Sequence, residues 1–180
     1  MSELQERVPD EKPTPELPPV ALWGALHTFP RAEKVVCEYL AKRSVPHFLP
    51  TVKKTRRYQS RVRISHLPLF PGYVFYDAQA ISRTEVFESR RIVSILDAQD
   101  QAELRRDLQN LSLALSKDDA LCAARYGEVG KPVQVVRGKL KGLRGEIVRI
   151  ESATRLLIRV HFIGQAACLA IDESMVEPDL

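Results

Sequence analysis

The chain has 180 residues, of which 44% are hydrophobic and 28% are charged. That length and apolar share suit one ordinary domain or two small ones around a packed core. No uncharged stretch approaches the roughly 18–20 apolar residues of a membrane span, and the acidic, proline-rich beginning of the chain does not resemble a signal peptide. We therefore predict a soluble, cytoplasmic protein that does not bind a membrane.

The net charge of +4 is unevenly distributed along the chain. Residues 21–84 hold eleven Lys or Arg against three Asp or Glu, whereas residues 85–128 hold six against nine. Between Tyr39 and Tyr76 there are eight basic residues and no acidic one. Such a block is either a solvated face or a surface for a polyanion such as nucleic acid, and composition alone leaves both readings open.

The sequence offers little that could support catalysis. Cys37, Cys122 and Cys168 lie far apart without a Cys-x-x-Cys pair, which argues against a disulfide framework or a zinc site. The four histidines are scattered, and none has a cysteine, serine or carboxylate at the spacing of a catalytic triad. Residues 138–142 lack the Gly-Lys-Ser/Thr ending of a phosphate-binding loop. We predict that the protein is not an enzyme and needs no metal or cofactor.

The chain begins with a Pro/Glu-rich segment, residues 1–20, whose few large apolar groups predict a disordered tail. The apolar run of residues 20–27 predicts a buried strand. Thr28 and Pro30 supply the signals of a helix start, with Thr28 as the expected N-cap. The apolar stripe across residues 32–40 then predicts an amphipathic helix.

The middle of the chain reads as strands around a basic segment. Residues 45–52 predict a strand whose prolines favour an edge position. The basic residues 53–60 predict a hairpin tip, and the alternation in residues 61–65 predicts the returning strand. Residues 69–76 form the densest aromatic cluster of the chain, with a Pro-Gly break at the entry to another strand.

Two capping boxes mark the next helices. The box at residues 82–85 predicts a short helix, and the box at residues 100–103 precedes a leucine stripe that ends at Leu115. Residues 92–96 predict a strand between them. The element order predicts an α+β domain over residues 21–115, with a mostly antiparallel sheet flanked by helices.

The last third of the chain changes character. Residues 116–130 begin polar and contain glycines, so they predict a linker. Residues 131–180 hold several short strand-like runs separated by glycine turns, which predict a small β-barrel. The sequence therefore predicts two domains joined by a linker.

Two motifs point to a family. The first is Leu69-Phe-Pro-Gly-Tyr-Val-Phe75, and the second is the KOW pattern of residues 130–147, in which valines alternate into a basic turn containing Gly138, Gly142 and Gly145. With both motifs in this order, residues 21–180 resemble the NusG/RfaH family of transcription elongation and antitermination factors. The resemblance implies an N-terminal NGN domain and a C-terminal KOW domain with an SH3-like barrel.

In that family the NGN domain docks on the clamp helices of RNA polymerase, suppresses pausing and increases processivity. The resemblance implies that an apolar, aromatic depression makes this contact, as expected of an interface hot spot. For Trp23 and Phe75, ordinary core packing is the alternative. The implied polymerase-binding residues are Phe70, Tyr73 and Phe75, with Trp23 and Phe29 nearby.

The resemblance also implies three further contacts. Ser82, Arg83 and Thr84 align with the motif that reaches the polymerase gate loop, although a helix cap explains Ser82 equally well. Around Phe162, Ile163, Gly164 and Gln165 the KOW domain of the family contacts Rho or a small-subunit ribosomal protein. Weak, salt-dependent contacts with non-template or upstream DNA are implied for Arg31, Lys53, Lys54, Arg56, Arg57, Arg61 and Arg63.

Our interpretation is a monomeric, non-enzymatic transcription elongation or antitermination factor that clamps onto RNA polymerase and recruits a further partner through its KOW domain. Gln165 stands where housekeeping NusG proteins usually have arginine, which favours a specialised paralogue. The alternative is a KOW-type RNA-binding protein of the ribosome or of RNA processing, whose basic residues contact RNA directly. Whether the KOW domain masks the polymerase-binding surface is a question that the sequence leaves open.

Overall fold

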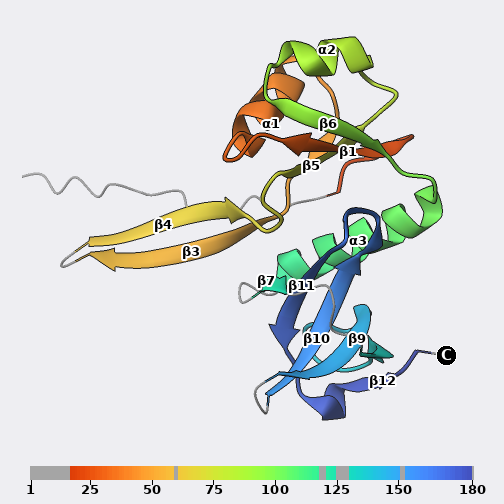
Figure 1. Ribbon diagram of the computed structural model, residues 1–180. Coiled ribbons are helices and arrows are strands. Elements are labelled where there is room, and N and C mark those ends of the chain that lie inside the picture. Colours follow the sequence, from red (N-terminus) through yellow and green to blue (C-terminus); the bar gives the residue numbers. More distant parts are fainter. Residues whose placement is uncertain (1–16, 59–60, 118–120, 125–129, 151–152, 180) are drawn as a thin grey trace, which may run out of the picture.

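A computed structural model describes residues 17–58, 61–117, 121–124, 130–150 and 153–179. Two β-rich parts lie on either side of a long helix, and a two-stranded ribbon projects from the first part (Figure 1). Most of the predicted tail, residues 1–16, lies outside the described residues. The mixed helix and sheet content agrees with the predicted α+β class.

The N-terminal sheet contains four antiparallel strands in the order β2-β5-β1-β6. In its register Ala25 lies between Phe75 on β5 and Leu96 on β6. Because side chains alternate along a strand, one face carries Trp23, Ala25 and Phe75, and the other carries Leu26. The strands are β1 (Trp23–Thr28), β2 (His47–Phe48), β5 (Tyr73–Asp77) and β6 (Ile92–Asp97).

Helices α1 (Glu33–Lys42) and α2 (Arg83–Glu88) cover the face that carries Leu26, where Val36 and Val86 join one buried cluster. The predicted capping box of α2 is confirmed, since Ser82 and Glu85 bond each other reciprocally. The predicted N-cap at Thr28 is wrong. Helix α1 starts one turn later, after Ala32, and has no side-chain cap, because Thr28 instead ends β1 in the sheet.

Helix α3 (Gln101–Lys117) packs against the opposite face of this sheet. Its predicted leucine stripe is confirmed as buried. The side chain of Gln101 accepts a hydrogen bond from the Trp23 N–H at 2.8 Å and donates one to the Trp23 carbonyl at 2.8 Å. The start of α3 is therefore fixed to both backbone polar groups of Trp23 on β1.

The C-terminal β-domain is a six-stranded antiparallel sheet in the order β12-β8-β9-β10-β11-β7. Strand β7 lies within the segment predicted as a linker and pairs with the edge strand β11. Residues 118–120 and 125–129 of that segment lie outside the described residues. The elements are β7 (Cys122–Ala124), β8 (Lys131–Val135), β9 (Arg144–Ile150), β10 (Ala153–Val160), η1 (His161–Ile163), β11 (Gln165–Ala170), η2 (Glu173–Met175) and β12 (Val176–Pro178).

The ribbon consists of β3 (Thr51–Tyr58) and β4 (Arg61–Pro68), paired over their whole length. It extends away from both sheets (Figure 1). The predicted hairpin is confirmed, but the segment of residues 53–60 that was expected to be its tip is mostly strand. β-branched side chains favour an extended backbone, and long basic side chains are well hydrated on a ribbon that faces solvent.

Candidate functional site

The Phe-Pro-Gly-Tyr segment is anchored by its glycine. Gly72 has a φ of +87°, a left-handed conformation that strongly favours glycine. Its N–H donates to the buried Glu33 carboxylate at 2.7 Å, and its carbonyl accepts from the Thr28 N–H at 2.8 Å. These bonds join α1, β1 and the turn, so they fix the position at which Tyr73 enters β5.

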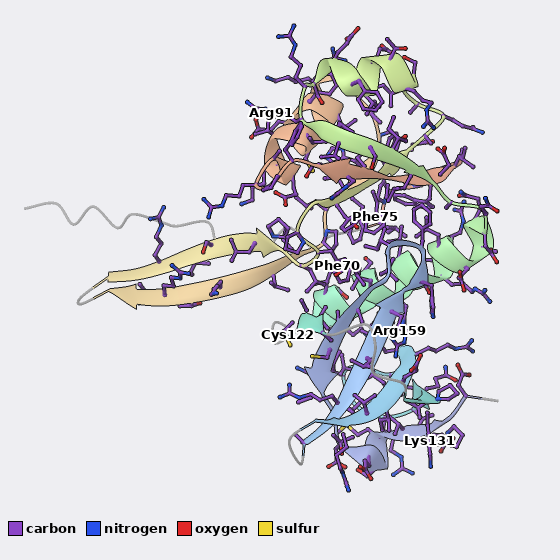
Figure 2. All side chains as sticks on the ribbon, viewed as in Figure 1. Phe70, Phe75, Arg91, Cys122, Lys131 and Arg159 are labelled. Atoms are coloured by element: carbon purple, nitrogen blue, oxygen red, sulfur yellow. The ribbon has the colours of Figure 1, made fainter. Side chains whose placement is uncertain are left out.

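Tyr73 is the accessible member of an aromatic face. Its ring stacks on His27, with centroids 5.2 Å apart and planes inclined by 19°. Trp23, Phe70 and Phe75 are at most 1% exposed, so the alternative of core packing fits them. Figure 2 shows Phe70 and Phe75 on the side of the sheet that faces α3. We call the set Trp23, Phe70, Tyr73 and Phe75 the aromatic face.

Phe29 does not join the aromatic face. It is 48% exposed, and its backbone N–H donates to the Arg91 carbonyl between β1 and β6. Among the described residues, the Trp23 indole N–H is a buried donor without an acceptor.

The aromatic face is continuous with the core of the C-terminal β-domain. One buried cluster contains Phe70 and Phe75, the inner side of α3, and Leu156 and Ile158 of β10. Phe162 is half-buried against the same cluster. In Figure 1 the turn between β10 and β11 lies beside α3. The two segments that the resemblance links to protein partners therefore both border the cluster around α3, where the two domains are in contact.

Two polar side chains of α3 hold the C-terminal β-domain at this contact. One carboxylate oxygen of Asp107 accepts from the His161 N–H at 2.9 Å and lies 3.1 Å from His161 Nδ1. Burial raises the pKa of Asp107 above its ordinary value, against the opposing effect of the hydrogen bonds from His161. The Asn110 amide accepts from the Arg144 N–H at 2.9 Å and donates to the Arg144 carbonyl. We call Asp107 and Asn110, with the backbone groups they bind, the α3 latch.

The residues aligned with the gate-loop motif lie at the start of α2. Ser82 Oγ donates to the Glu85 carboxylate at 2.6 Å and accepts from the Glu85 N–H at 3.3 Å. This bonding lowers the pKa of Glu85. Arg83 makes two bonds to Asp97, at 2.7 and 3.0 Å. Ser82 therefore caps α2, as the helix-cap alternative expects, Arg83 is paired with Asp97, and Thr84 is exposed.

The ribbon carries most of the basic block. The register places Arg56 opposite Arg63, and Lys54 lies opposite Ser65 on the same face. This register gathers basic side chains on one face of the ribbon, where they could contact the phosphates of a polyanion. Lys53, Lys54, Arg56 and Arg63 are exposed, while the side chains of Arg57 and Arg61 fall outside the described part.

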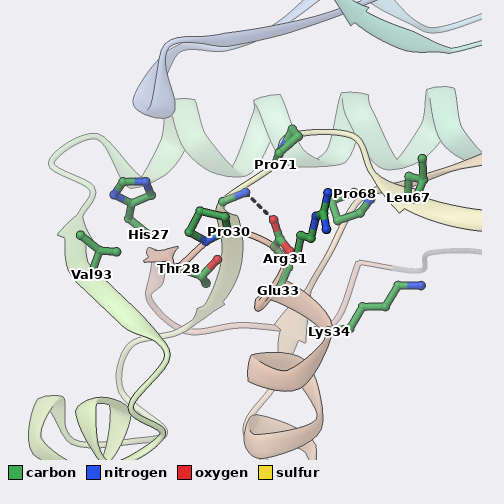
Figure 3. A pocket seen from close by; sticks show the side chains of 11 residues that line it. His27, Thr28, Pro30, Arg31, Glu33, Lys34, Leu67, Pro68, Pro71 and Val93 are labelled. Atoms are coloured by element: carbon green, nitrogen blue, oxygen red, sulfur yellow. Dashed lines mark hydrogen bonds between the residues drawn. The ribbon is translucent and has the colours of Figure 1, made fainter.

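Arg31 lies beside an open cavity of about 720 Å³ at the base of the ribbon. Figure 3 shows Arg31 and Lys34 beside walls formed by Leu67, Pro68 and Pro71. Arg31 itself has a φ of +62°, because the chain turns sharply between β1 and α1. Cationic groups beside an apolar hollow suit a ligand that combines an anion with a flat apolar ring.

Comparison with known families identifies the first domain. Residues 21–109 match the family model described as "Transcription termination factor nusG". Residues 21–109 form a NusG-family domain. Proteins of this family are transcription factors, and the match supports a general role of this chain in transcription elongation or antitermination.

The NusG domain and the C-terminal β-domain together were compared with solved structures. A structure described as "Domain interaction in Thermotoga maritima NusG" matches 87% of this chain and 96% of its own, with 20% identity and a TM-score of 0.46. One described as "MjSpt4:Spt5 complex conformation B" has the same coverage, 17% identity and a TM-score of 0.30. A search of curated protein sequences found no match. Within the described ranges, no helix is long and apolar enough to cross a membrane.

Sequence reasoning missed the α3 latch and the cavity of the NusG domain. Asp107 and Asn110 look like ordinary polar positions of an amphipathic helix, and their partners are 54 and 34 residues away. The cavity walls come from segments that the fold brings together. The prolines near the end of the ribbon marked one wall of this cavity in the sequence. They carry no information about which other segment forms the facing wall.

Proposed function

We propose that this chain binds the clamp helices of RNA polymerase through the aromatic face of its NusG domain, suppresses pausing and increases processivity. The observation that carries the proposal is the anchored Phe-Pro-Gly-Tyr segment within a NusG-family domain. It presents Tyr73, a large amphipathic ring, at the rim of an apolar aromatic cluster. Rings of this kind are common binding hot spots.

The closed arrangement of the domains regulates this binding. Phe162 and the α3 latch hold the C-terminal β-domain beside the aromatic face. We propose that clamp helices reach Tyr73, at the edge of the aromatic face, only after this domain has moved away from α3. The apparent affinity for polymerase is then the intrinsic affinity multiplied by the fraction of molecules that are open.

Released from α3, the C-terminal β-domain exposes its own segment for a partner. Phe162, Ile163, Gly164 and Gln165 lie in and directly after η1, where Gly164 ends the turn with a φ of +59°. We propose that this segment binds a small-subunit ribosomal protein or Rho. Polymerase binding and partner binding then favour the same open form, which couples them positively.

The ribbon adds a weaker contact with nucleic acid. We assign the exposed cations Lys53, Lys54, Arg56 and Arg63, together with Arg31 at the cavity, to non-template or upstream DNA near the polymerase. Lys and Arg on a ribbon give salt-dependent attraction to phosphates with little sequence preference. This electrostatic attraction helps to hold the factor on the polymerase, but it does not select a target sequence.

The test compares full-length wild type, Tyr73→Ala and Tyr39→Ala for binding to RNA polymerase core enzyme, with circular dichroism to check folding. Tyr39 is the matched control, because it is half-buried, as Tyr73 is, but lies on α1 over the opposite face of the sheet. We expect Tyr73→Ala alone to lose binding. If Tyr73→Ala binds like wild type while charge reversal at Lys54 and Arg63 abolishes RNA binding, the chain is an RNA-binding KOW protein instead.

A further inference from the structure

Two of the three cysteines meet in the C-terminal β-domain, although 46 residues separate them in sequence. Strand β7 pairs with β11 so that Cys122 lies directly opposite Cys168, and their Sγ atoms are 3.0 Å apart. Opposed residues of antiparallel strands have Cα atoms about 4.5–5.5 Å apart, within the roughly 4.4–6.8 Å range that disulfides span. The backbone thus holds the two thiols where a disulfide forms without movement of the strands.

The two thiols differ in accessibility, so an oxidant in solution reaches Cys122 before Cys168. Cys122 is exposed on the edge strand β7, whereas Cys168, opposite it on β11, is buried. Figure 2 shows Cys122 near the end of α3. Cys37 in the NusG domain is different, since burial raises the pKa of its thiol to about 12. Thiolates rather than thiols react with oxidants, so Cys37 serves as an inert internal reference.

We propose that Cys122 and Cys168 form a reversible disulfide that fastens the segment after α3 to the C-terminal β-domain. The Cys122 thiolate attacks one sulfur of a low-molecular-weight disulfide such as glutathione disulfide, giving a mixed disulfide and one released thiolate. The Cys168 thiolate then attacks the Cys122 sulfur and displaces the second thiolate. Two electrons pass from the cysteines to the oxidant, and the released thiolates take up the two protons.

The disulfide shortens the connection between the domains. Helix α3 ends at Lys117, and Cys122 follows five residues later, a reach of at most about 18 Å. When the three-residue β7 detaches from β11, the connection instead runs from Lys117 to Lys131, with a reach of about 50 Å. Effective concentration falls roughly as the −3/2 power of connection length. Oxidation therefore favours closure at the α3 latch by up to about fivefold.

The first experiment tests bond formation. The folded full-length protein is incubated with glutathione disulfide, trapped by acid, and analysed by non-reducing peptide mass spectrometry. We expect an intramolecular Cys122–Cys168 link, an unmodified Cys37, and reversal by dithiothreitol. Stable glutathione on Cys122, a disulfide between two chains, or no reaction would each overturn the proposal. Cys122→Ser removes an exposed group and should fold normally, and it should not form the link.

The second experiment tests closure without using polymerase, so that its outcome is independent of the proposed function. The amide of His161 donates to Asp107 across the contact, and its hydrogen exchange therefore reports on opening. We expect slower exchange of this amide in the oxidised protein, by up to about fivefold. The same change should occur in Cys37→Ser and be absent in Cys122→Ser. Equal exchange in oxidised and reduced wild type would refute the link between the disulfide and closure.

Discussion

Removal of the Asn110 side chain should open the contact between the two domains. In the structure this amide makes both a donor and an acceptor bond with the backbone of Arg144. A typical net contribution is about 0.5–1.5 kcal/mol per neutral hydrogen bond. Both bonds lie at an exposed rim where water can replace them, so Asn110→Ala should destabilise the closed form by about 1–2 kcal/mol.

A change of this size lowers the closed-to-open ratio by about 5–30-fold. We expect the His161 amide to exchange faster by that factor, since its bond to Asp107 is broken in the open form. The affinity for RNA polymerase should rise by the same factor for as long as the closed form predominates. The linked change in both observables separates domain opening from general destabilisation.

Gln109→Ala is the matched control for this experiment. Gln109 is an exposed amide on the same helix, one position before Asn110, so its truncation to Ala likewise raises helix propensity slightly. Hydrogen exchange by nuclear magnetic resonance and polymerase titration should leave Gln109→Ala close to wild type. The reasoning fails if Asn110→Ala and Gln109→Ala give the same His161 exchange rate and the same polymerase affinity.

Three further predictions concern other parts of the chain. Glu146 is paired bidentately with Arg159 at 2.7 and 3.0 Å, and this bonding lowers the pKa of Glu146 below 4.5. The pair should therefore contribute fully to the free energy of unfolding above pH 4.5, and this contribution should be lost as the pH falls through the lowered pKa. Acid unfolding curves of Glu146→Gln should lack this pH-dependent loss of stability. Gly145→Ala would place a Cβ 2.2 Å from the Leu157 carbonyl oxygen, so calorimetry should show a Tm at least about 5 °C lower than wild type; an unchanged Tm would contradict this packing. Arg63→Ala should reduce the slope of log affinity for DNA against log salt by about 0.9, whereas the same change at the exposed Lys42 of α1 should not.

Local patterns predicted most elements because their causes are local. The leucine stripe of α3 has helical spacing, and the Ser82 box satisfies the first backbone donors of α2 with side chains three residues apart. The N-cap expected at Thr28 failed for a non-local reason. The N–H of Thr28 donates to the Gly72 carbonyl, 44 residues later in the chain. This bond keeps Thr28 in the sheet, so its side chain is not available to cap α1.

The site was predictable only in its composition. The motif around Gly72 indicated which aromatic residues gather, and four of the five proposed ones do gather on one face. Phe29 differs because a bulge in the pairing of β1 with β6, between His27 and Thr28, shifts the register. The α3 latch and the Cys122–Cys168 pair depend on how two domains and an edge strand meet. No periodicity within one segment contains that information.

The chemistry of the domain contact suits an interface that has to open. Its apolar part, around Phe162 and the inner side of α3, supplies non-directional attraction. Its polar part uses Asp107 and Asn110 to bind backbone groups, and water can replace these hydrogen bonds when the domains separate. The latch therefore contributes geometric specificity to the closed form while keeping its release reversible.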